Sequence, residues 1–389
     1  MRFCSIFSQL LQTFPRGEFH AAVKETKAER HARGFTCWEQ FVAMLFCQLA
    51  QAQSLREVCL GLASYKGKLC HLGLKTAPAR STLAYANQHR AVQLYETVFY
   101  QLLARCQQAA KHQGQGAKLR FKNQLLSIDA STIELCAQVF DWAKFRRAKG
   151  AVKLHLVLQH QGYLPTFALI TPGCQHEVTV ARTLSFETGT ILVIDRGYTD
   201  YTWFADLTRR GVYFVTRLKH NAVYEVVEER VVPRNRQVLA DQVIRLSATG
   251  AAATGAAATG AAAKCPHLLR RVEVYDPHTQ KVLVFLTNHL AFGATTIAAI
   301  YKERWQIELF FKALKQNLKI KTFIGTSANA LKIQVWTALI AMLLLRYLQL
   351  KSRFGWAFSH LVTLLRLNLM TYCHLWPWLE DPYERPTPT

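Results

Sequence analysis

Two aspartates in this sequence each follow a short, mostly apolar run of the kind that forms a buried strand. Asp129 follows Leu-Leu-Ser-Ile, and Asp195 follows Ile-Leu-Val-Ile. An ionised carboxylate is costly at such a place unless it emerges at the end of a sheet or lies beside a cation. Each aspartate alone is also compatible with a turn or a cap residue. Placed together on neighbouring strands, the two carboxylates would form a cradle for a metal ion.

A third carboxylate, Glu308, lies in the stretch YKERWQIELFFKALKQNLK at 301–319, whose apolar spacing is that of a helix. Advancing about 100° per residue places Glu308 on one arc, roughly 80° wide, with an aromatic side chain and several cations. These neighbours are Tyr301, Arg304, Lys312, Lys315 and Lys319. Glu303, the competing acid, falls among the apolar positions, so Glu308 is the better candidate for a metal ligand.

Glu308 has two interpretations. It could form an ordinary surface ion pair with Arg304, four residues earlier, which would contribute only a few tenths of a kcal/mol. Alternatively, Glu308 could hold a divalent cation while the basic side chains around it grip phosphates. Three carboxylates would bind Mg²⁺ through hard oxygen ligands, and two such ions suit phosphodiester chemistry.

The charge of the chain favours a polyanionic partner. Lys and Arg number 48 against 25 Asp and Glu, a formal net charge of +23 spread along 389 residues. Nucleic acid is the first candidate. A basic membrane-surface protein is the alternative, but the sequence contains neither an amphipathic anchor nor a lipidation motif. The ten cysteines form no C-x-x-C pair, which indicates reduced thiols in a cytosol.

The elements that would position the acids change type along the chain. From Lys27 to about Gln113, apolar residues recur every three or four positions, as in helices. The polar segment HQGQGAK at 112–118 is typical of a linker. Short β-branched runs follow up to about residue 288, and helical spacing returns from Thr295. This succession predicts a mixed α/β sheet with a helical region before it.

The helical region contains a candidate reader of duplex DNA. The stretch 54–90 has the pattern of a helix, a Gly-containing turn and a second helix. Arg80 lies near the start of the second helix and could face a groove. Plain packing of helices explains the same pattern, and the sequence leaves both interpretations open.

Two further segments need an interpretation. Residues 248–264 repeat a unit of Ala, Gly and Thr that cannot bury a useful core, so we expect a surface loop. The run from Ile333 to Leu350 is apolar enough for a membrane span but contains Gln334, Arg346 and Gln349. We therefore expect a helix buried in a large core.

Several of these motifs resemble those of a known family. The spacing Y-x2-R-x3-E-x6-K of Tyr301, Arg304, Glu308 and Lys315 resembles the signature of DDE transposases of the Insertion Sequence four family. The segments SIDAST and VIDRGYTDYTWF resemble the regions around that family's two catalytic aspartates. The N-terminal region is similar to the leading domain of one branch, so the resemblance covers nearly the whole chain.

The resemblance implies a ribonuclease H-like, mixed-sheet catalytic core with a β-rich insertion and an N-terminal helical domain. The helical domain, expected at 1–115, would bind DNA ends. The core would comprise 119–222 and 291–350, the second part carrying the helix with Glu308. The insertion would occupy 223–290, including the low-complexity loop at 248–264, and 351–389 would form a C-terminal helix and tail.

The resemblance also implies a function. Asp129, Asp195 and Glu308 would be the catalytic and metal-binding residues, holding two Mg²⁺ ions that Mn²⁺ could replace. The DNA-binding residues would be Tyr301, Arg304, Lys312, Lys315, Lys319 and Arg80.

The expected protein is a transposase that binds terminal inverted repeats and performs metal-dependent cleavage and strand transfer. It would act on double-stranded DNA as a homodimer in a synaptic complex, in the bacterial cytoplasm at the nucleoid, with no membrane partner. The alternatives are a nuclease without strand transfer and a transposase-derived DNA-binding protein.

Overall fold

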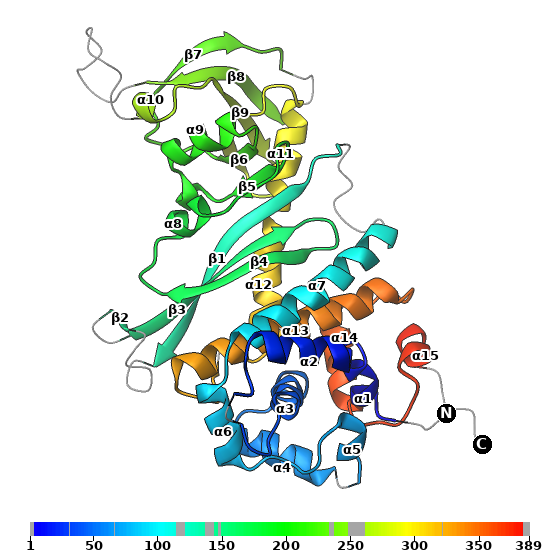
Figure 1. Cartoon of the computed structure of the whole chain (residues 1–389). Coiled ribbons are helices and arrows are strands. Elements are labelled where there is room, and N and C mark those ends of the chain that lie inside the picture. The colour runs from blue at the N-terminus through cyan, green and yellow to red at the C-terminus, as the bar shows by residue number, and fades with distance from the viewer. Residues whose placement is uncertain are drawn as a thin grey trace. The chain divides into compact units, whose positions relative to one another are not determined.

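The computed structural model in Figure 1 describes residues 4–30, 32–65, 67–113, 121–136, 144–146, 149–232, 237–247, 261–320 and 322–383. The chain forms two compact units. Unit 1 comprises Met1–Gln115, Thr132–Val152 and Phe310–Thr389, and unit 2 comprises Gly116–Ser131 and Lys153–Leu309. Most of the linker expected at 112–118 and of the low-complexity loop expected at 248–264 lies outside the described residues.

Unit 1 is mainly helical. Its helices are α1 (Ile6–Leu11), α2 (Arg16–Glu25), α3 (Cys37–Leu49), α4 (Leu55–Ser64), α5 (Leu69–Leu72), α6 (Arg80–His89), α7 (Gln93–Gln113), α13 (Ala328–Lys351), α14 (Phe358–Asn368) and α15 (Leu375–Glu380). Helix α13 packs against α3, α6, α7 and α14, so it forms the centre of this unit. Farther from α13, helix α2 packs on α7, α4 packs on α3 and α6, and α1 packs on α5 and α15.

Among the described residues, α13 is the one helix long and apolar enough to cross a membrane, yet 83% of its most apolar window is buried. Its polar residue Gln334 is fully buried and satisfied. The Gln334 amide donates to the carbonyls of Lys319 (2.7 Å) and Thr322 (2.8 Å), and its oxygen accepts from the Ile324 amide (2.9 Å). A core helix, as expected for 333–350, is confirmed.

A mixed sheet forms most of unit 2. The described strands are β1 (Leu125–Cys136), β2 (Lys144–Arg146), β3 (Lys149–Gln159), β4 (Leu164–Pro172), β5 (Ile191–Ile194), β6 (Tyr213–Arg217), β7 (Tyr224–Glu229), β8 (Val238–Leu246), β9 (Leu269–Asp276) and β10 (Lys281–Thr287). Their order is β2-β3-β1-β5-β6-β10-β9-β8-β7, with β4 paired to β3. Strands β1, β5 and β6 run parallel, and β7 to β10 are antiparallel. The mixed α/β sheet expected from the sequence is therefore confirmed, and β10 joins the later strands to it through β6.

Helices cover both faces of this sheet because successive strand residues point to opposite sides. Leu126 and Ile128 of β1 belong to the core that also contains residues of α9 (Tyr201–Arg209). Leu125, one position earlier, belongs to the opposite core, with Ile297 of α11 (Ala294–Glu303). Figure 1 shows α9 and α11 beside the strands of this unit. Because side chains alternate along a strand, each residue of β1 and β5 points to the face of the sheet covered by α9 or to the face covered by α11.

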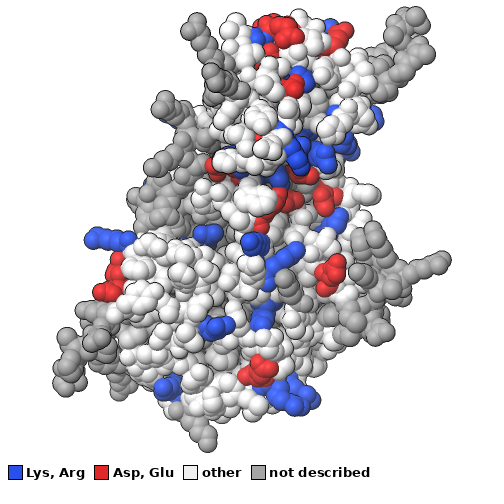
Figure 2. All heavy atoms as spheres, turned by 180° about the vertical axis from the view of Figure 1, so that it is seen from behind, with Lys and Arg blue, Asp and Glu red and all other residues white. Residues whose placement is uncertain are grey.

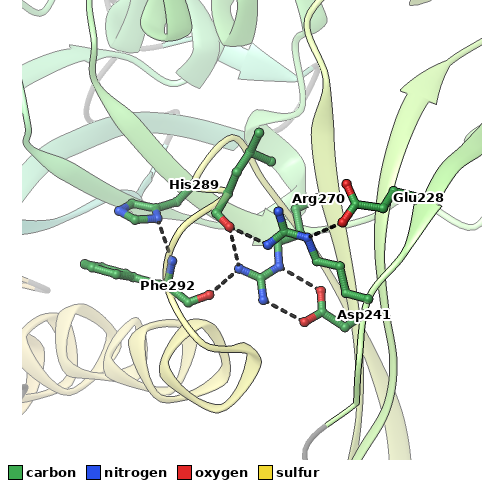
Figure 3. A network of polar contacts seen from close by, with 7 residues as sticks. Glu228, Asp241, Arg270, His289 and Phe292 are labelled. Atoms are coloured by element: carbon green, nitrogen blue, oxygen red, sulfur yellow. Dashed lines mark hydrogen bonds and ion pairs between the residues drawn. The ribbon is translucent and has the colours of Figure 1, made fainter.

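A buried ion pair fixes the segment that leads from β10 into α11 (Figure 3). The Arg270 guanidinium donates two hydrogen bonds to Asp241, both 2.7 Å long, and the two side chains are 3% and 5% exposed. Arg270 also donates to the carbonyls of Leu290 and Phe292. The guanidinium therefore ties the start of α11 to strands β8 and β9.

Candidate active site

Asp129 and Asp195 lie side by side at the end of a parallel strand pair. The register of β1 and β5 ends with Ile128 opposite Ile194, and each aspartate is the next residue. Neighbouring strands lie about 4.8 Å apart. Counting by two from Leu125 and Ile191, which face α11, places both aspartates on that same face. The two aspartates therefore lie on neighbouring strands and on one face of the sheet, and their joint role as metal ligands stays a prediction.

The prediction that a strand ends at Asp129 is wrong. Strand β5 stops at Ile194, but β1 continues to Cys136. Asp129 thus lies at the point where β1 loses its parallel partner, and the strand itself goes on. Asp195 begins a 3-10 turn at Arg196–Tyr198, and its carboxylate accepts a hydrogen bond from the Gly197 amide, 3.2 Å away.

The ionisation of the Asp129 carboxyl is perturbed by its surroundings. Burial raises the pKa of Asp129 to about 6, and the charges of Glu177 and Glu308 act in the same direction. The Ala130 amide, which donates to the carboxyl at 2.8 Å, and the cation of Arg304 lower this pKa in part. Asp129 therefore lies in a buried, acid-rich place that favours an added positive charge.

Glu308 lies just after a helix break that the sequence did not indicate. The single helix expected at 301–319 is wrong, because α11 ends at Glu303 and α12 spans Trp305–Asn317. At the junction, the Arg304 amide donates to Tyr301 and the Ile307 amide donates to Arg304, both three residues apart. These tighter turns interrupt the α-helical ladder. Glu308 consequently occupies the first turn of α12 and does not lie midway along one long helix.

Arg304 is the cation between the acids. Its guanidinium lies 2.6 Å from a Glu308 oxygen, and the side chains are 16% and 33% exposed. Burial acts to lower the pKa of Arg304, but Tyr301, Glu308 and Asp195 raise it above its ordinary value. The ion pair therefore forms, but it is half-buried and joined electrostatically to Asp195. It is more than an isolated surface pair.

The donor chemistry of this site suits a hard divalent cation. Three carboxylates on β1, β5 and α12 offer the oxygen ligands that Mg²⁺ prefers. The pKa of Asp129, which burial raises first and the charges of Glu177 and Glu308 raise further, would be lowered by a bound cation. In the described part of the chain, however, no three His, Cys, Asp or Glu side chains are gathered closely enough to hold a metal ion. Arg304 adds a positive charge beside these carboxylates through its contact with Glu308.

The remaining predicted residues divide between the two units. Tyr301 belongs to unit 2, where its ring packs 4.9 Å from that of Phe285. Lys312, Lys315, Lys319 and Arg80 belong to unit 1. The Lys315 ammonium donates to the Thr132 carbonyl at 3.2 Å, whereas Lys312 is exposed. Arg80 is exposed at the first position of α6, where a groove-facing residue would lie.

One acid of this site was missed. Glu177, the first residue of α8 (Glu177–Arg182), lies 3.2 Å from the Lys153 ammonium and acts electrostatically on Asp129. It follows the polar residues Gln175 and His176, so no buried run marked it in the sequence. Knowledge of which elements flank β1 would have been needed to identify it.

Comparisons with known proteins place the chain in a family. Residues 120–344 match the model described as Transposase DDE domain, and residues 4–75 match Domain of unknown function (DUF4372). A protein of Sinorhizobium fredii whose name describes it as a transposase is 32% identical over 274 residues, 69% of this chain and 71% of that protein. A Geobacillus stearothermophilus protein named as an insertion-sequence transposase is 29% identical over 232 residues, 59% of this chain and 58% of its own length.

A chain of the piggyBac transposase synaptic complex with hairpin DNA aligns with a TM-score of 0.47 and 11% identity, covering 99% of this chain and 83% of its own. The family model, together with the observed mixed sheet and N-terminal helices, confirms the expected α/β class, with a mixed-sheet transposase domain and a helical N-terminal region. The chain belongs to the DDE transposase family, in agreement with its resemblance to Insertion Sequence four transposases.

Proposed function

We propose that this protein binds the terminal inverted repeats of an insertion sequence, cleaves phosphodiester bonds at its ends and transfers the freed strands to target DNA. Asp129, Asp195 and Glu308 are the proposed catalytic residues. The observation that carries the proposal is the placement of both aspartates one residue beyond a matched strand pair, on the face covered by α11. Arg304, at the end of α11, links that face to Glu308.

The proposed cofactor is Mg²⁺, with two ions and with Mn²⁺ as a substitute. When bound, Mg²⁺ activates a hydroxyl and stabilises the leaving oxygen of a phosphodiester. The chain's own contribution is the charge and placement of three carboxylates. Asp129 must be ionised to serve as a ligand, which a nearby divalent cation would favour. Arg304 contacts one Glu308 oxygen at 2.6 Å and so helps to orient that carboxylate.

The proposed DNA contacts are made by Tyr301, Arg304, Lys312, Lys315, Lys319 and Arg80. The lysines and Arg304 would bind phosphates, which position DNA without reading its sequence. Arg80, exposed at the start of α6, is the candidate for a base contact. Figure 2 shows Lys and Arg side chains spread over the drawn surface among acidic ones, which suits many separate phosphate contacts.

The proposal includes assembly and location. Strand transfer of two element ends requires that they be held together, and a homodimer in a synaptic complex provides one active site for each end. The protein would act in the bacterial cytoplasm, at the nucleoid.

One observation favours a second candidate. Since no metal-holding group of three side chains is gathered among the described residues, a transposase-derived DNA-binding protein without cleavage is the alternative. A nuclease that cleaves but does not join is the related enzymatic alternative.

A single assay separates these functions. The full chain is incubated with Mg²⁺, target plasmid and a duplex carrying the DNA that flanks its reading frame. The transposase produces nicked ends and joined products, the nuclease produces nicked ends only, and the binding protein shifts the duplex in a gel without cutting it. Asp129→Asn is the control and should abolish all cutting.

A further inference from the structure

Three polar side chains contact one another in a buried series beside the proposed active site. The Ser127 hydroxyl on β1 lies 2.7 Å from Nε2 of His160, and Nδ1 of His160 lies 3.5 Å from Oε2 of Glu303. Ser127 is 0% exposed, and the side chains of His160 and Glu303 are 2% and 23% exposed. All three belong to unit 2. They connect β1, the turn after β3 and the last residue of α11.

The order serine, histidine, acid is that of a hydrolytic triad, but this arrangement does not serve as one. A nucleophilic serine must reach its substrate, whereas the Ser127 hydroxyl is enclosed and hydrogen-bonded to the ring. The His160 backbone is anchored as well, because its amide donates to the Leu125 carbonyl at 3.1 Å. The role of these three residues must therefore depend on the groups that lie beside Ser127 and Glu303.

The two outer residues of this series, Ser127 and Glu303, each lie next to proposed catalytic groups. Ser127 precedes Asp129 by two residues on β1, so their side chains point to the same face of the sheet. Glu303 immediately precedes Arg304, whose guanidinium holds Glu308 at 2.6 Å. His160 thus lies between the strand that carries one catalytic carboxylate and the helix junction that orients another.

Buried polar atoms at this junction are left without hydrogen bonds. Nδ1 of His160, Oε2 of Glu303 and Nε of Arg304 are all buried without a hydrogen-bond partner in the described structure. Buried polar atoms rarely stay unpaired, because the lost hydration is not replaced. Nδ1 and Oε2 face each other across 3.5 Å, so a small approach would convert their contact into a charge-assisted hydrogen bond.

We propose that His160 and Glu303 are positioning residues of the DDE centre. Their contact holds the α11–α12 junction against β1, and it thereby sets Arg304 and Glu308 relative to Asp129. The inference rests on the proposed function, since it assumes that those carboxylates form the active site. Neither residue would touch the reacting atoms. Each acts through the residue next to it, as the groups behind a metal's ligands commonly do.

The test uses the full chain and four variants. Glu303→Gln removes the charge but keeps the size of the side chain, and His160→Gln can keep the Ser127 contact while losing the Glu303 contact. The double variant carries both changes, and exposed Glu187→Gln is the control for loss of one negative charge. The measurements are the single-turnover cleavage rate on saturating flanking-sequence DNA, the duplex dissociation constant, and the Mg²⁺ concentration that half-saturates the rise in melting temperature of the protein–DNA complex.

Each single variant should cleave about 10- to 100-fold more slowly and need about tenfold more Mg²⁺ for the thermal shift, with DNA affinity unchanged. Because the two residues act through one contact, the double variant should cleave within about threefold of the slower single variant. Glu187→Gln should match the wild type. A structural role alone would reduce the folded fraction and leave the Mg²⁺ requirement unchanged.

Three results would overturn the inference: wild-type rates in folded single variants, a double-variant defect equal to the product of the single defects, or an unchanged Mg²⁺ requirement. If both glutamine variants fail to fold, Ser127→Ala replaces them, and a wild-type Mg²⁺ requirement in that variant counts equally against the inference. A wild-type protein that does not cleave, or an active Asp129→Asn variant, would refute the proposed function instead.

Discussion

Asp129 and Asp195 are adjacent across two parallel strands, each one residue beyond the matched pair Ile128 and Ile194. The apolar pair fixes the strands in register, because a slip of one residue would move every side chain to the opposite face. A shift in β5 would therefore bury Asp195 in the core beside α9 and separate the two carboxylates. The packing of the sheet thus determines the geometry of the proposed active site.

We expect Asp129→Asn to stabilise the metal-free protein at neutral pH. The folded pKa of about 6 lies above the ordinary value of 3.8, so the stability that protonation provides is complete below about pH 4 and is lost as pH rises through 6. The asparagine variant carries no such carboxyl, so its free energy of unfolding should not fall over this pH range. Near pH 7 it should exceed that of the wild type by up to about 3 kcal/mol. Thermal melts in chelator between pH 4 and 8 would measure the difference. Parallel pH profiles of the two proteins would contradict the ionisation assigned to Asp129.

DNA affinity should fall steeply with salt concentration. Each neutralised phosphate contributes about −0.9 to the slope of log affinity against log salt on duplex DNA. Lys312→Ala or Lys315→Ala should each lower the magnitude of that slope by about one. Lys281→Ala, which removes an exposed lysine on β10, is the matched control. A wild-type slope near zero would exclude a phosphate-binding surface altogether.

Arg80 should contribute to sequence preference more than to general affinity. If its guanidinium reads a base edge, Arg80→Ala should reduce the preference of the full chain for its flanking sequence over a scrambled duplex by about 1 to 3 kcal/mol. Competition binding at one salt concentration measures this ratio. Equal losses on both duplexes would reduce Arg80 to a phosphate contact and leave α4 and α6 with a packing role.

The buried pair of Arg270 and Asp241 should be important for folding. Asp241→Asn leaves a buried guanidinium without its counter-charge and should destabilise the protein by about 3 to 5 kcal/mol. Glu225→Gln is the matched control, because it breaks the Arg245–Glu225 contact, whose side chains are 53% and 56% exposed. That change should have an effect below about 1 kcal/mol. Urea unfolding compares the two, and similar losses would refute a special role for the buried pair.

The sequence predicted the features that depend on local pattern. Apolar runs before Asp129 and Asp195 identified two strands, and β-branched segments between helical regions predicted the mixed sheet. The run from Ile333 was predicted to be a buried core helix because it contains a few polar residues. Those polar residues form hydrogen bonds within the unit. Each inference relied on residues close together in the chain.

Features that depend on distant segments could not be predicted. The break at Arg304 leaves the apolar spacing of 301–319 intact, so a helical wheel does not reveal it. Glu177 acts on Asp129 only because the fold brings α8 near β1. His160 and Glu303 lie 143 residues apart by their numbers, and nothing local relates one to the other. These contacts are determined by tertiary packing.

The central claim is that Asp129, Asp195 and Glu308 form one metal-dependent active site. Its most direct test is single-turnover cleavage of flanking-sequence DNA with Mg²⁺ by Asp129→Asn, Asp195→Asn and Glu308→Gln, with duplex affinity measured in parallel. We predict that each variant loses about a thousandfold or more of the rate, that combined variants lose little further, and that affinity changes little. Cleavage near the wild-type rate by any one folded variant would contradict the assignment of that residue and the proposed site.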